Sequence, residues 1–557
     1  MGGGPAGSYA ASVLAREGID TVVLEADKFP RYHIGESTLP SLRDFFDFID
    51  FYDIVNKHGF YHKNGATFRL NQSQPDAYTD FLAAGGPEGY AWNFIRSEFD
   101  DLLFRHAERS GASIFEETKV ETIRFDTQEA RSPSQDGNTS FNERPVAATW
   151  RRKDGLSGKI TYDYLVDASG RHGILSTKYI KSRKFNKSFQ NIANWAYWKS
   201  DNVYGPGTHM EGSPYFEALQ DGSGWAWFMP LHDGTRSVGV VQDQKLAAKR
   251  KRELGSLATQ EFYTESLKLA TRTQALLSGA ELIPDIKSAS DWSYTSSTYH
   301  LPYARICGDA GAFIDPLFSS GLHLAVTGGL SAAVTIATSI RGDIDEAAAG
   351  SWHSKKTVEC YTRFLLAVTS AAKQISSREE PIIQEMDEEG FQRAFDILRP
   401  IIQGSVDVNN SGGPMPRMEI SEVLDFCFKA FTYVPPEEKE ALFAKLDRLH
   451  VSLTSDGDVT TESLDAVRQH LTPDERQMVE VLRSRRMIRE DPFDVDSFTL
   501  DTIDGLAPRL ERGRLGLVGT QRSKLDANHF YSPSFLDGKV PGIRDGSTHQ
   551  QYLQTVE

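Results

Sequence analysis

Apolar and polar positions follow different periods along the chain, and the changes of period mark its elements. Residues 8–17 have helical composition, Gly18 suits the C-terminal cap of that helix, and 21–25 form a short apolar run that ends in an acid. Similar runs at 163–170 and 304–309 also end in Asp and small residues. Small residues at strand ends let the backbone approach a ligand at the carboxyl edge of a sheet. The pattern predicts an α/β fold with a ligand site at that edge.

A second pattern indicates further layers. Residues 194–199 and 225–241 are rich in aromatic residues and alternate as strands do, which predicts a β-sheet layer inserted into the α/β core. Residues 325–340 and 352–377 have helical periodicity. We therefore expect an α/β (α+β) protein with a nucleotide-binding domain at 1–335 and interleaved substrate-binding sheet segments around 55–100 and 180–300, a mainly helical C-terminal domain at 336–536 and a flexible tail at 537–557.

Composition narrows the classes of function. With 557 residues, 39% hydrophobic and 25% charged, the chain suits a soluble globular protein of two or three structural units. Its net charge is -16 and its one dense basic run is 249–252, so no nucleic-acid partner is expected. The cysteines, Cys307, Cys360 and Cys427, form no C-x-x-C pair, which favours a reducing, cytoplasmic location without a metal site. We expect no membrane span and no signal peptide.

The chain opens with a glycine loop of the spacing G-x-G-x-x-G, at Gly2, Gly4 and Gly7, with Ala6 inside it. Glycines let the backbone approach phosphate oxygens, and the N-terminus of the helix that follows faces their negative charge. Glu25 lies about 20 residues further on, where an acid accepts hydrogen bonds from a ribose. Loop, helix, strand and acid together predict dinucleotide binding. A strand normally precedes such a loop, so we expect this sequence to lack that first strand.

Four sequence blocks stand out in a fixed order. They are the glycine loop with Glu25, Arg31-Tyr32-His33-Ile34-Gly35-Glu36-Ser37, Trp225-Ala226-Trp227-Phe228-Met229-Pro230, and Asp315-Pro316-Leu317-Phe318-Ser319-Ser320-Gly321-Leu322-His323 after Gly308-Asp309. Together they resemble the two-component, FADH2-dependent halogenases, particularly the fungal enzymes that chlorinate phenolic polyketides. The third block resembles the family pattern W-x-W-x-I-P, with Met229 in place of Ile, and ordinary flavin hydroxylases lack it. The resemblance covers residues 1–330 strongly.

The resemblance implies an FAD-binding Rossmann-like domain of the aromatic-hydroxylase type. Besides the glycine loop and Glu25, it places Arg31, Ser37, Arg96 and Asp309 beside the cofactor, with Asp309 accepting ribityl hydroxyls. No convincing second dinucleotide loop is visible, which favours reduced FAD supplied by a separate flavin reductase. The implied reaction uses reduced FAD, dioxygen and chloride or bromide to make a hypohalous acid, which crosses an internal channel to the substrate.

The resemblance also assigns the halide site and the halogenating residue. Backbone N–H groups of a Ser-Ser-Gly turn can hold chloride, which assigns Ser320 and Gly321 to the halide, with Ser319 supporting the turn. Lys63 resembles the family's active-site lysine, whose ammonium hydrogen-bonds the hypochlorous acid or whose amine carries its chlorine.

The remaining family positions bear on the channel and the substrate. Trp225, Trp227 and Pro230 belong to the motif that separates flavin from substrate in the family. Phe318 stands where tryptophan halogenases carry a Glu, and this difference favours an electron-rich, phenolic substrate over free tryptophan. A phenol activates its own ring, so it does not need a carboxylate to assist proton loss.

Other interpretations stay open. Trp225 and Trp227 lie two apart, so on a strand they share one face and suit a plain core. Ser-Ser-Gly also fits an ordinary loop, and a lysine chosen at random lies at the surface. The main rival function is an FAD-dependent aromatic monooxygenase that hydroxylates its substrate and reduces its own flavin with NAD(P)H. A flavoprotein that only binds FAD and a geranylgeranyl-reductase-like enzyme are further rivals.

Overall fold

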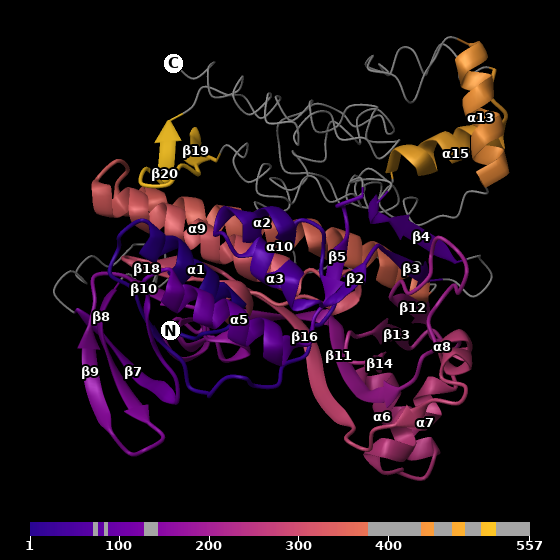
Figure 1. The fold of residues 1–557 in the computed structure, drawn as a ribbon, viewed down its shortest axis with the longest axis horizontal. Helices are drawn as coiled ribbons and strands as arrows, with labels where there is room; N and C mark the ends of the chain where they lie inside the picture. Colours follow the sequence, from indigo (N-terminus) through magenta and orange to yellow (C-terminus); the bar gives the residue numbers. More distant parts are fainter. Residues whose placement is uncertain are drawn as a thin grey trace, which may run out of the picture.

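The computed structural model describes residues 1–70, 76–82, 87–126, 143–376, 436–449, 470–484 and 503–519. Figure 1 shows a large sheet on one side of the molecule, a small three-stranded sheet on the other, and helices between and above them. The predicted flexible tail at 537–557 lies outside the described residues.

Short parallel strands form the nucleotide-binding part. Its elements are α1 (Pro5–Arg16), β1 (Val22–Leu24), α5 (Arg96–Arg109), β6 (Ser113–Phe115), β10 (Leu165–Asp167), β17 (His300–Leu301), β18 (Ala304–Ile306) and α9 (Gly321–Arg341). β1 pairs with β6, and β10 pairs with β18, both in parallel. The first residues lie between these pairs, since the Gly2 N–H donates to the Leu24 carbonyl and the Ala168 N–H donates to the Met1 carbonyl, each at 2.9 Å. The chain therefore enters α1 at the carboxyl end of the strands.

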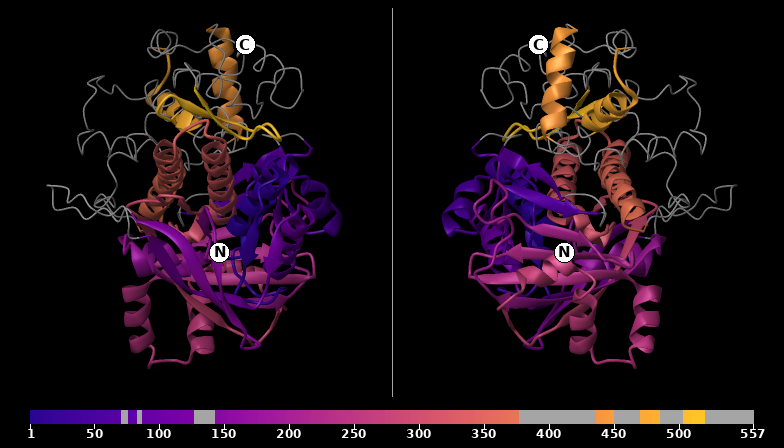
Figure 2. Two further views of the ribbon diagram at one scale, coloured as in Figure 1. Left: turned by 90° about the vertical axis from the view of Figure 1, so that its left-hand side faces the viewer. Right: turned by 90° about the vertical axis from the view of Figure 1, so that its right-hand side faces the viewer.

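The large sheet holds eight strands. They are β3 (Gly65–Arg69), β4 (Ala77–Asp80), β11 (Arg183–Lys199), β12 (Tyr215–Ala218), β13 (Gly224–Pro230), β14 (Thr235–Asp243), β15 (Glu281–Leu282) and β16 (Lys287–Ser296). Their order is β15-β11-β14-β13-β12-β3-β4, and β16 pairs with β11. The helices that follow β14 project from this sheet in the side views of Figure 2, and they are α6 (Gln244–Glu253), α7 (Thr259–Leu267) and α8 (Thr271–Leu276).

The two faces of the large sheet bury different residues, as the period of two along a strand requires. Phe216, Trp225 and Trp227 lie on one face and belong to the main hydrophobic core, which continues into the nucleotide-binding part. Phe228 and Val238 point to the opposite face and pack with residues of α7. The sheet therefore separates the ligand-binding side of the molecule from a layer of covering helices.

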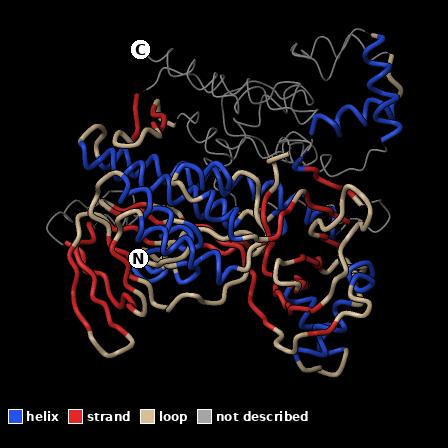
Figure 3. The backbone as a smooth tube through the Cα atoms, in the orientation of Figure 1, coloured by secondary structure: helices blue, strands red, loops and turns tan. Residues whose placement is uncertain are grey.

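The remaining elements connect and cover these two parts. Figure 3 distinguishes the helices, strands and loops of the described residues by colour. The elements are α2 (Leu42–Phe48), α3 (Tyr52–His58), β2 (Tyr61–Lys63), β5 (Ala91–Asn93), β7 (Thr118–Asp126), β8 (Arg144–Arg152), β9 (Ser157–Thr161), α10 (Glu346–Ser376), α13 (Pro436–Arg448), α15 (Pro473–Ser484), β19 (Leu506–Arg509) and β20 (Gly516–Gly519). β2 pairs with β5 in an antiparallel fashion, which fixes the strand that ends at Lys63.

Helix α9 is the core helix of the molecule. Val326, Leu330 and Val334 recur every fourth residue and are all 0% exposed. A Cβ at Gly329 would meet the backbone of Ala6 and Ala10, so the small residue allows α9 to lie close against α1. By length and composition α9 is the described helix that could span a membrane, yet 83% of its apolar window is buried inside the molecule.

The elements expected from the sequence agree with the structure where it describes them. The helix expected at 8–17 is α1, and the strands expected at 21–25, 163–170 and 304–309 are β1, β10 and β18. The segment 225–241 is two strands, β13 and β14, joined by a turn. The expected domain boundary at 335/336 falls inside α9, and the C-terminal part contains the β19–β20 hairpin beside its helices.

Replacing Leu330 with Ala tests the importance of α9. The change removes a fully buried side chain from a packed helix, so it should lower the free energy of unfolding by about 2–5 kcal/mol. Ile340→Ala is the matched control on the same helix, because Ile340 is 48% exposed and its loss should change stability by about 0.5 kcal/mol or less. Urea denaturation of both variants gives the comparison, and equal losses would contradict the role of α9 as a core helix.

Candidate active site

The glycine loop is packed too closely for side chains. A Cβ at Gly7 would overlap the carbonyl oxygen of Gly2, and a Cβ at Gly2, whose φ is +93°, would overlap the carbonyl of Ala168. Gly2, Gly7 and Ala168 therefore form a bare backbone cradle between β1, β10 and the start of α1. The α1 N-terminus opens on this cradle with Gly4 as its N-cap and no side-chain cap. Such a cradle suits the pyrophosphate of a dinucleotide.

Glu25 closes one side of the loop. Its Oε2 accepts from the Gly3 N–H at 2.5 Å and its Oε1 accepts from the Asp27 N–H at 2.8 Å. These bonds hold a carboxylate that is 7% exposed at the end of β1, next to the glycine loop. The structure thus brings Glu25 to the place where a ribose would meet it. Its role toward that ribose stays a prediction.

Two predicted cofactor residues, Arg31 and Arg96, share one buried carboxylate. Arg96 binds both oxygens of Asp100 (2.9 and 3.1 Å), and Arg31 lies 2.8 Å from the same carboxylate. The two guanidinium groups hold the pKa of Asp100 below its usual range against the effect of burial. Arg96 also donates to the carbonyls of Ile34 (2.9 Å) and Gly35 (3.1 Å). Asp100 therefore fixes two cations, and Arg31 lies beside the glycine loop, since a Cβ at Gly4 would be 3.4 Å from its Nη2 atom.

Asp309 completes the cofactor side. It lies in the turn after β18, and burial raises the pKa of its carboxyl while the charges of Arg171 and Arg96 lower it. A Cβ on the neighbouring Gly308 would lie 3.2 Å from the Cβ of Ala6, so this turn packs directly against the start of α1. Asp309, Arg96 and Ala6 are therefore brought to one edge of the sheet, and their contacts with the cofactor stay a prediction.

Lys63 is buried, with 1% of its surface exposed. Its Nζ donates to the Ser37 hydroxyl at 2.9 Å and to the Thr38 carbonyl at 2.8 Å, and it lies 5.2 Å from the centre of the Phe81 ring. A surface lysine would not be enclosed in this way, so the structure argues against that alternative. Ser37, which was predicted to contact the cofactor, contacts the lysine in this structure.

The W-x-W-x-x-P block is bound to the other blocks through polar contacts. The Trp227 Nε1–H donates to the Ser237 hydroxyl at 3.1 Å, and the Pro230 carbonyl accepts from the Asn93 side chain at 3.0 Å. Asn93 and Ser37 also form an isolated antiparallel β-bridge. Pro230 therefore contacts a residue that pairs with Ser37, the hydrogen-bond partner of Lys63. Trp225 hydrogen-bonds Asp315 of the fourth block. These Trp residues are core residues that also connect the predicted site.

Asp315 is a second buried acid of this region. Burial raises its pKa to about 6, while bonds from the Leu317 N–H, from Asn191 and from Trp225 oppose that rise. The Asn191 amide donates at 2.9 Å and the Leu317 N–H at 3.1 Å. Asp315 therefore fixes the turn that leads to Phe318 and the Ser-Ser-Gly sequence.

An aromatic cluster joins the large sheet to the fourth block. The Phe68 ring stacks on Phe216 (5.0 Å between centroids) and lies 5.6 Å from Phe318. Phe216 in turn lies 6.1 Å from Trp225, and Trp225 lies 5.8 Å from Trp227. An apolar environment of this kind excludes water and suits an aromatic substrate. Phe318 is part of it.

The Ser-Ser-Gly turn carries an unsatisfied donor. Ser319 takes a left-handed conformation (φ 58°), and Ser320 becomes the N-cap of α9. The Ser320 side chain is 0% exposed, and its hydroxyl has no hydrogen-bond partner among the described residues. A Cβ at Gly321 would meet open space, so no neighbouring atom crowds that side of the start of the 21-residue helix. A buried hydroxyl at the N-terminus of a helix fits an anion such as chloride.

The role of Glu36 was not predicted from the sequence, although the residue belongs to the second block. The Tyr197 hydroxyl donates to its Oε1 at 2.6 Å, and its Oε2 has no partner among the described residues. Burial raises the pKa of Glu36 to about 7, and hydrogen bonds from Ser237 and Tyr197 limit the rise. Since Ser237 also holds Trp227, this acid lies where the large sheet meets the lysine segment. Glu36 lies between Gly35 and Ser37, and no apolar period in this segment marks it as buried.

Similarity to known proteins identifies the family to which the chain belongs. The FAD binding domain family matches residues 1–358. The chain is 49% identical over 523 residues to the flavin-dependent halogenase ascD of Acremonium egyptiacum, covering 93% of this chain and 91% of the relative. It is 48% identical over 550 residues to the sulochrin halogenase gedL of Aspergillus terreus, covering 98% and 97%. The chain is a flavin-dependent halogenase.

Solved structures show the same fold for this halogenase. The flavin-dependent halogenase CmlS superposes with a TM-score of 0.61 at 28% identity, covering 80% of this chain and 77% of that chain. The myxobacterial chondrochloren halogenase CndH superposes with a TM-score of 0.59 at 26% identity, covering 78% and 97%. The fold is therefore the FAD-binding aromatic-hydroxylase type, as expected. The FAD cofactor follows from the family and fits the bare glycine cradle and the arginines beside it.

Replacing Gly7 with Ala tests the cofactor site of this halogenase. The added Cβ would overlap the Gly2 carbonyl and push the loop away from the pyrophosphate, so FAD affinity should fall by about tenfold or more. Gly519→Ala is the matched control, because a Cβ there meets open space. Flavin absorbance retained after desalting measures the effect, and circular dichroism confirms folding. Equal FAD retention in folded Gly7→Ala would contradict the assignment.

Replacing Glu36 with Gln tests the buried acid. The folded-state pKa of about 7 lies above the ordinary value of 4.5, so the folded protein holds this proton more tightly than the unfolded chain does. Stability should therefore fall as the pH rises from about 4.5 to about 7, by up to about 3 kcal/mol from this group.

The Gln variant has no proton to lose, so its stability should depend less on pH in that window and exceed the wild type at pH 8. Glu253→Gln, whose side chain is 62% exposed, serves as control and should keep the wild-type pH profile. Denaturation at pH 5 and pH 8 gives the measurement. Parallel profiles for wild type and Glu36→Gln would show that the carboxyl is already ionised when folded.

Proposed function

We propose that this halogenase places chlorine or bromine on an electron-rich aromatic ring, a phenolic polyketide, with Lys63 as the catalytic residue. When bound, reduced FAD supplies two electrons to dioxygen in the presence of chloride, and the products are oxidised FAD, hypochlorous acid and water. The substrate then exchanges a ring hydrogen for chlorine. The buried lysine carries this proposal, because its ammonium is enclosed by Ser37 of the second block, the Thr38 carbonyl and the Phe81 ring.

The halide is held by Ser320 and Gly321. The orphan hydroxyl of Ser320 and the first N–H groups of α9 supply donors without a bulky side chain. The positive end of the helix dipole adds to the attraction. Ser319 holds the turn in the conformation that exposes these groups.

Lys63 holds the hypochlorous acid at the substrate. Ser37 and the Thr38 carbonyl orient its Nζ, and Phe81 covers it on one side. Hydrogen bonding from this group polarises the oxygen–chlorine bond and directs chlorine to the ring. Trp225, Trp227 and Pro230 form the wall between the cofactor and the substrate.

A phenolic substrate is supported by two observations. Phe318 gives the aromatic cluster no carboxylate at the position where proton loss from an unactivated ring would need one. The sulochrin halogenase of Aspergillus terreus matches 98% of this chain, and a phenol such as sulochrin suits the apolar, aromatic surroundings. Bromide can replace chloride at a site built from N–H and hydroxyl donors.

A separate flavin reductase delivers the reduced cofactor in a reducing, cytoplasmic compartment. The two described cysteines, Cys307 and Cys360, are free and buried, which agrees with such a compartment. If the isolated protein instead oxidised NADPH rapidly and hydroxylated the same substrate, it would act as a one-component monooxygenase.

Lys63→Ala should lower the rate of chlorination by about 10²-fold or more while FAD stays bound. The assay contains the protein, FAD, a flavin reductase, NADH, a phenolic polyketide and chloride, and mass spectrometry detects the chlorine isotope pattern. Lys153→Ala, whose side chain is 80% exposed, is the control and should leave the rate unchanged. A Lys63→Ala enzyme that chlorinates near the wild-type rate would remove the lysine from the mechanism.

A further inference from the structure

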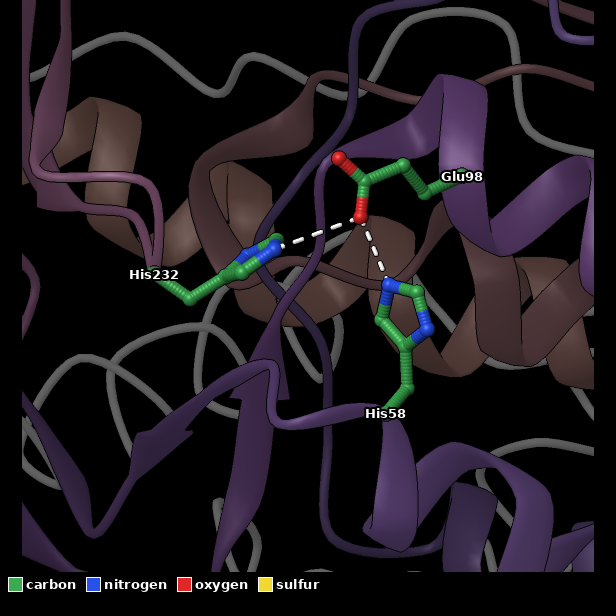
Figure 4. A group of neighbouring side chains, drawn as sticks. All are labelled: His58, Glu98 and His232. Carbon is green, nitrogen blue, oxygen red and sulfur yellow. Dashed lines mark hydrogen bonds and ion pairs between the residues drawn. The ribbon is translucent and has the colours of Figure 1, made fainter.

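Three side chains from separate segments, those of His58, Glu98 and His232, meet, as Figure 4 shows. His58 is the last residue of α3, Glu98 lies in the first turn of α5, and His232 lies between β13 and β14. The Nε2 atoms of His58 and His232 lie 2.6 and 3.2 Å from the same Glu98 oxygen. All three ligand atoms lie within 4.8 Å of one another.

We propose that His58, Glu98 and His232 bind a divalent transition-metal ion of the zinc type. Two imidazoles and one carboxylate, completed by water, are the ligand set of open zinc sites. With zinc–ligand bonds of about 2.0–2.2 Å, tetrahedral ligand atoms lie about 3.3 Å apart. The His232–Glu98 separation of 3.2 Å already matches this spacing. The His58–Glu98 contact needs to lengthen by about 0.7 Å, which a small side-chain rotation provides.

The two imidazoles are held on a common support. Phe60, which is 2% exposed, lies 4.3 Å from the His58 ring and 5.2 Å from the His232 ring between centroids. The two imidazoles lie 5.8 Å apart at an interplanar angle of 71°. Their orientation is therefore set by a buried ring, which reduces the entropy lost when an ion binds.

The charges around the site favour a cation. Within the described residues, Glu98 contacts these two histidines and forms an ion pair with no Lys or Arg. The side chains of His58, Glu98 and His232 are 30%, 38% and 22% exposed, so an ion and its water ligands can enter. The net charge of -16 adds a long-range attraction for cations.

The ion would join three segments of the halogenation site. Glu98 follows Arg96 on the same helical turn, His58 precedes the strand that ends at Lys63, and His232 follows Pro230. A bound ion would link the β13–β14 loop to α3 and α5. It would therefore stabilise the relative positions of these segments and take no part in the chemistry. The spacing of the cysteines led us to expect no metal site, and His58, Glu98 and His232 match no short ligand motif.

Tag-free, full-length protein stripped with EDTA and titrated with zinc chloride by calorimetry tests this proposal. The wild type should bind one Zn²⁺ per chain, and at about a hundredfold excess over Kd the melting temperature should rise by about 3 °C. His58→Ala, His232→Ala and Glu98→Gln should each weaken binding by about tenfold or more. His209→Ala, at an exposed loop histidine, is the control and should bind as the wild type does.

Cobalt(II) gives an independent readout that does not depend on stability. The wild type should show the visible absorption of tetrahedral cobalt, and the three ligand variants should lack it while keeping the circular dichroism of a folded protein. Absence of zinc binding by the wild type at micromolar concentrations would overturn the proposal. So would unchanged affinity in both histidine variants. Chlorination measured on the same samples is expected to persist without the ion, so failure here leaves the halogenase assignment intact.

Discussion

Enclosing the Lys63 side chain is the constraint on which the rest of the site depends. A buried amine is costly unless its donors are satisfied. Ser37 and Thr38 satisfy them, and this requires the second block to run beside β2 and β5. Asn93 of β5 then binds the carbonyl of Pro230, which brings the end of β13 to the same place. The position of one side chain thus determines how the large sheet docks on the nucleotide-binding part.

Among the described residues, few polar contacts connect the surroundings of the glycine loop with those of Lys63. Asp100 organises the arginines next to the glycine loop, while Glu36 and Ser237 connect the lysine segment to Trp227. Around these contacts lies aromatic packing that admits little water. Under the proposed mechanism, oxidant production and ring substitution take place in one molecule on different sides of the tryptophan pair.

Much of the fold and part of the site could be predicted from the sequence. Gly2, Gly7 and Glu25 form a local motif, and their close packing depends on residues near them in the chain. Lys63 and Ser320 could be named because they occupy fixed places in a family pattern. Glu36, Asn93 and Asp315 act by contacts between segments more than 100 residues apart, and no periodicity in the sequence encodes such pairs. The Ser37–Lys63 bond joins residues only 26 apart, but it too was missed, because it depends on how the second block lies beside β2 and not on any periodicity.

Helix α9 belongs both to the hydrophobic core and to the proposed halide site. Its middle turns are the hydrophobic core, and its first turn supplies the N–H groups beside Ser320. Because a helix moves nearly as a rigid rod, a repacking of the core that shifts its axis also shifts these groups. Attempts to make this halogenase more heat-resistant are therefore safer in the outer β7–β9 sheet than in α9, where repacking would also shift the proposed halide site.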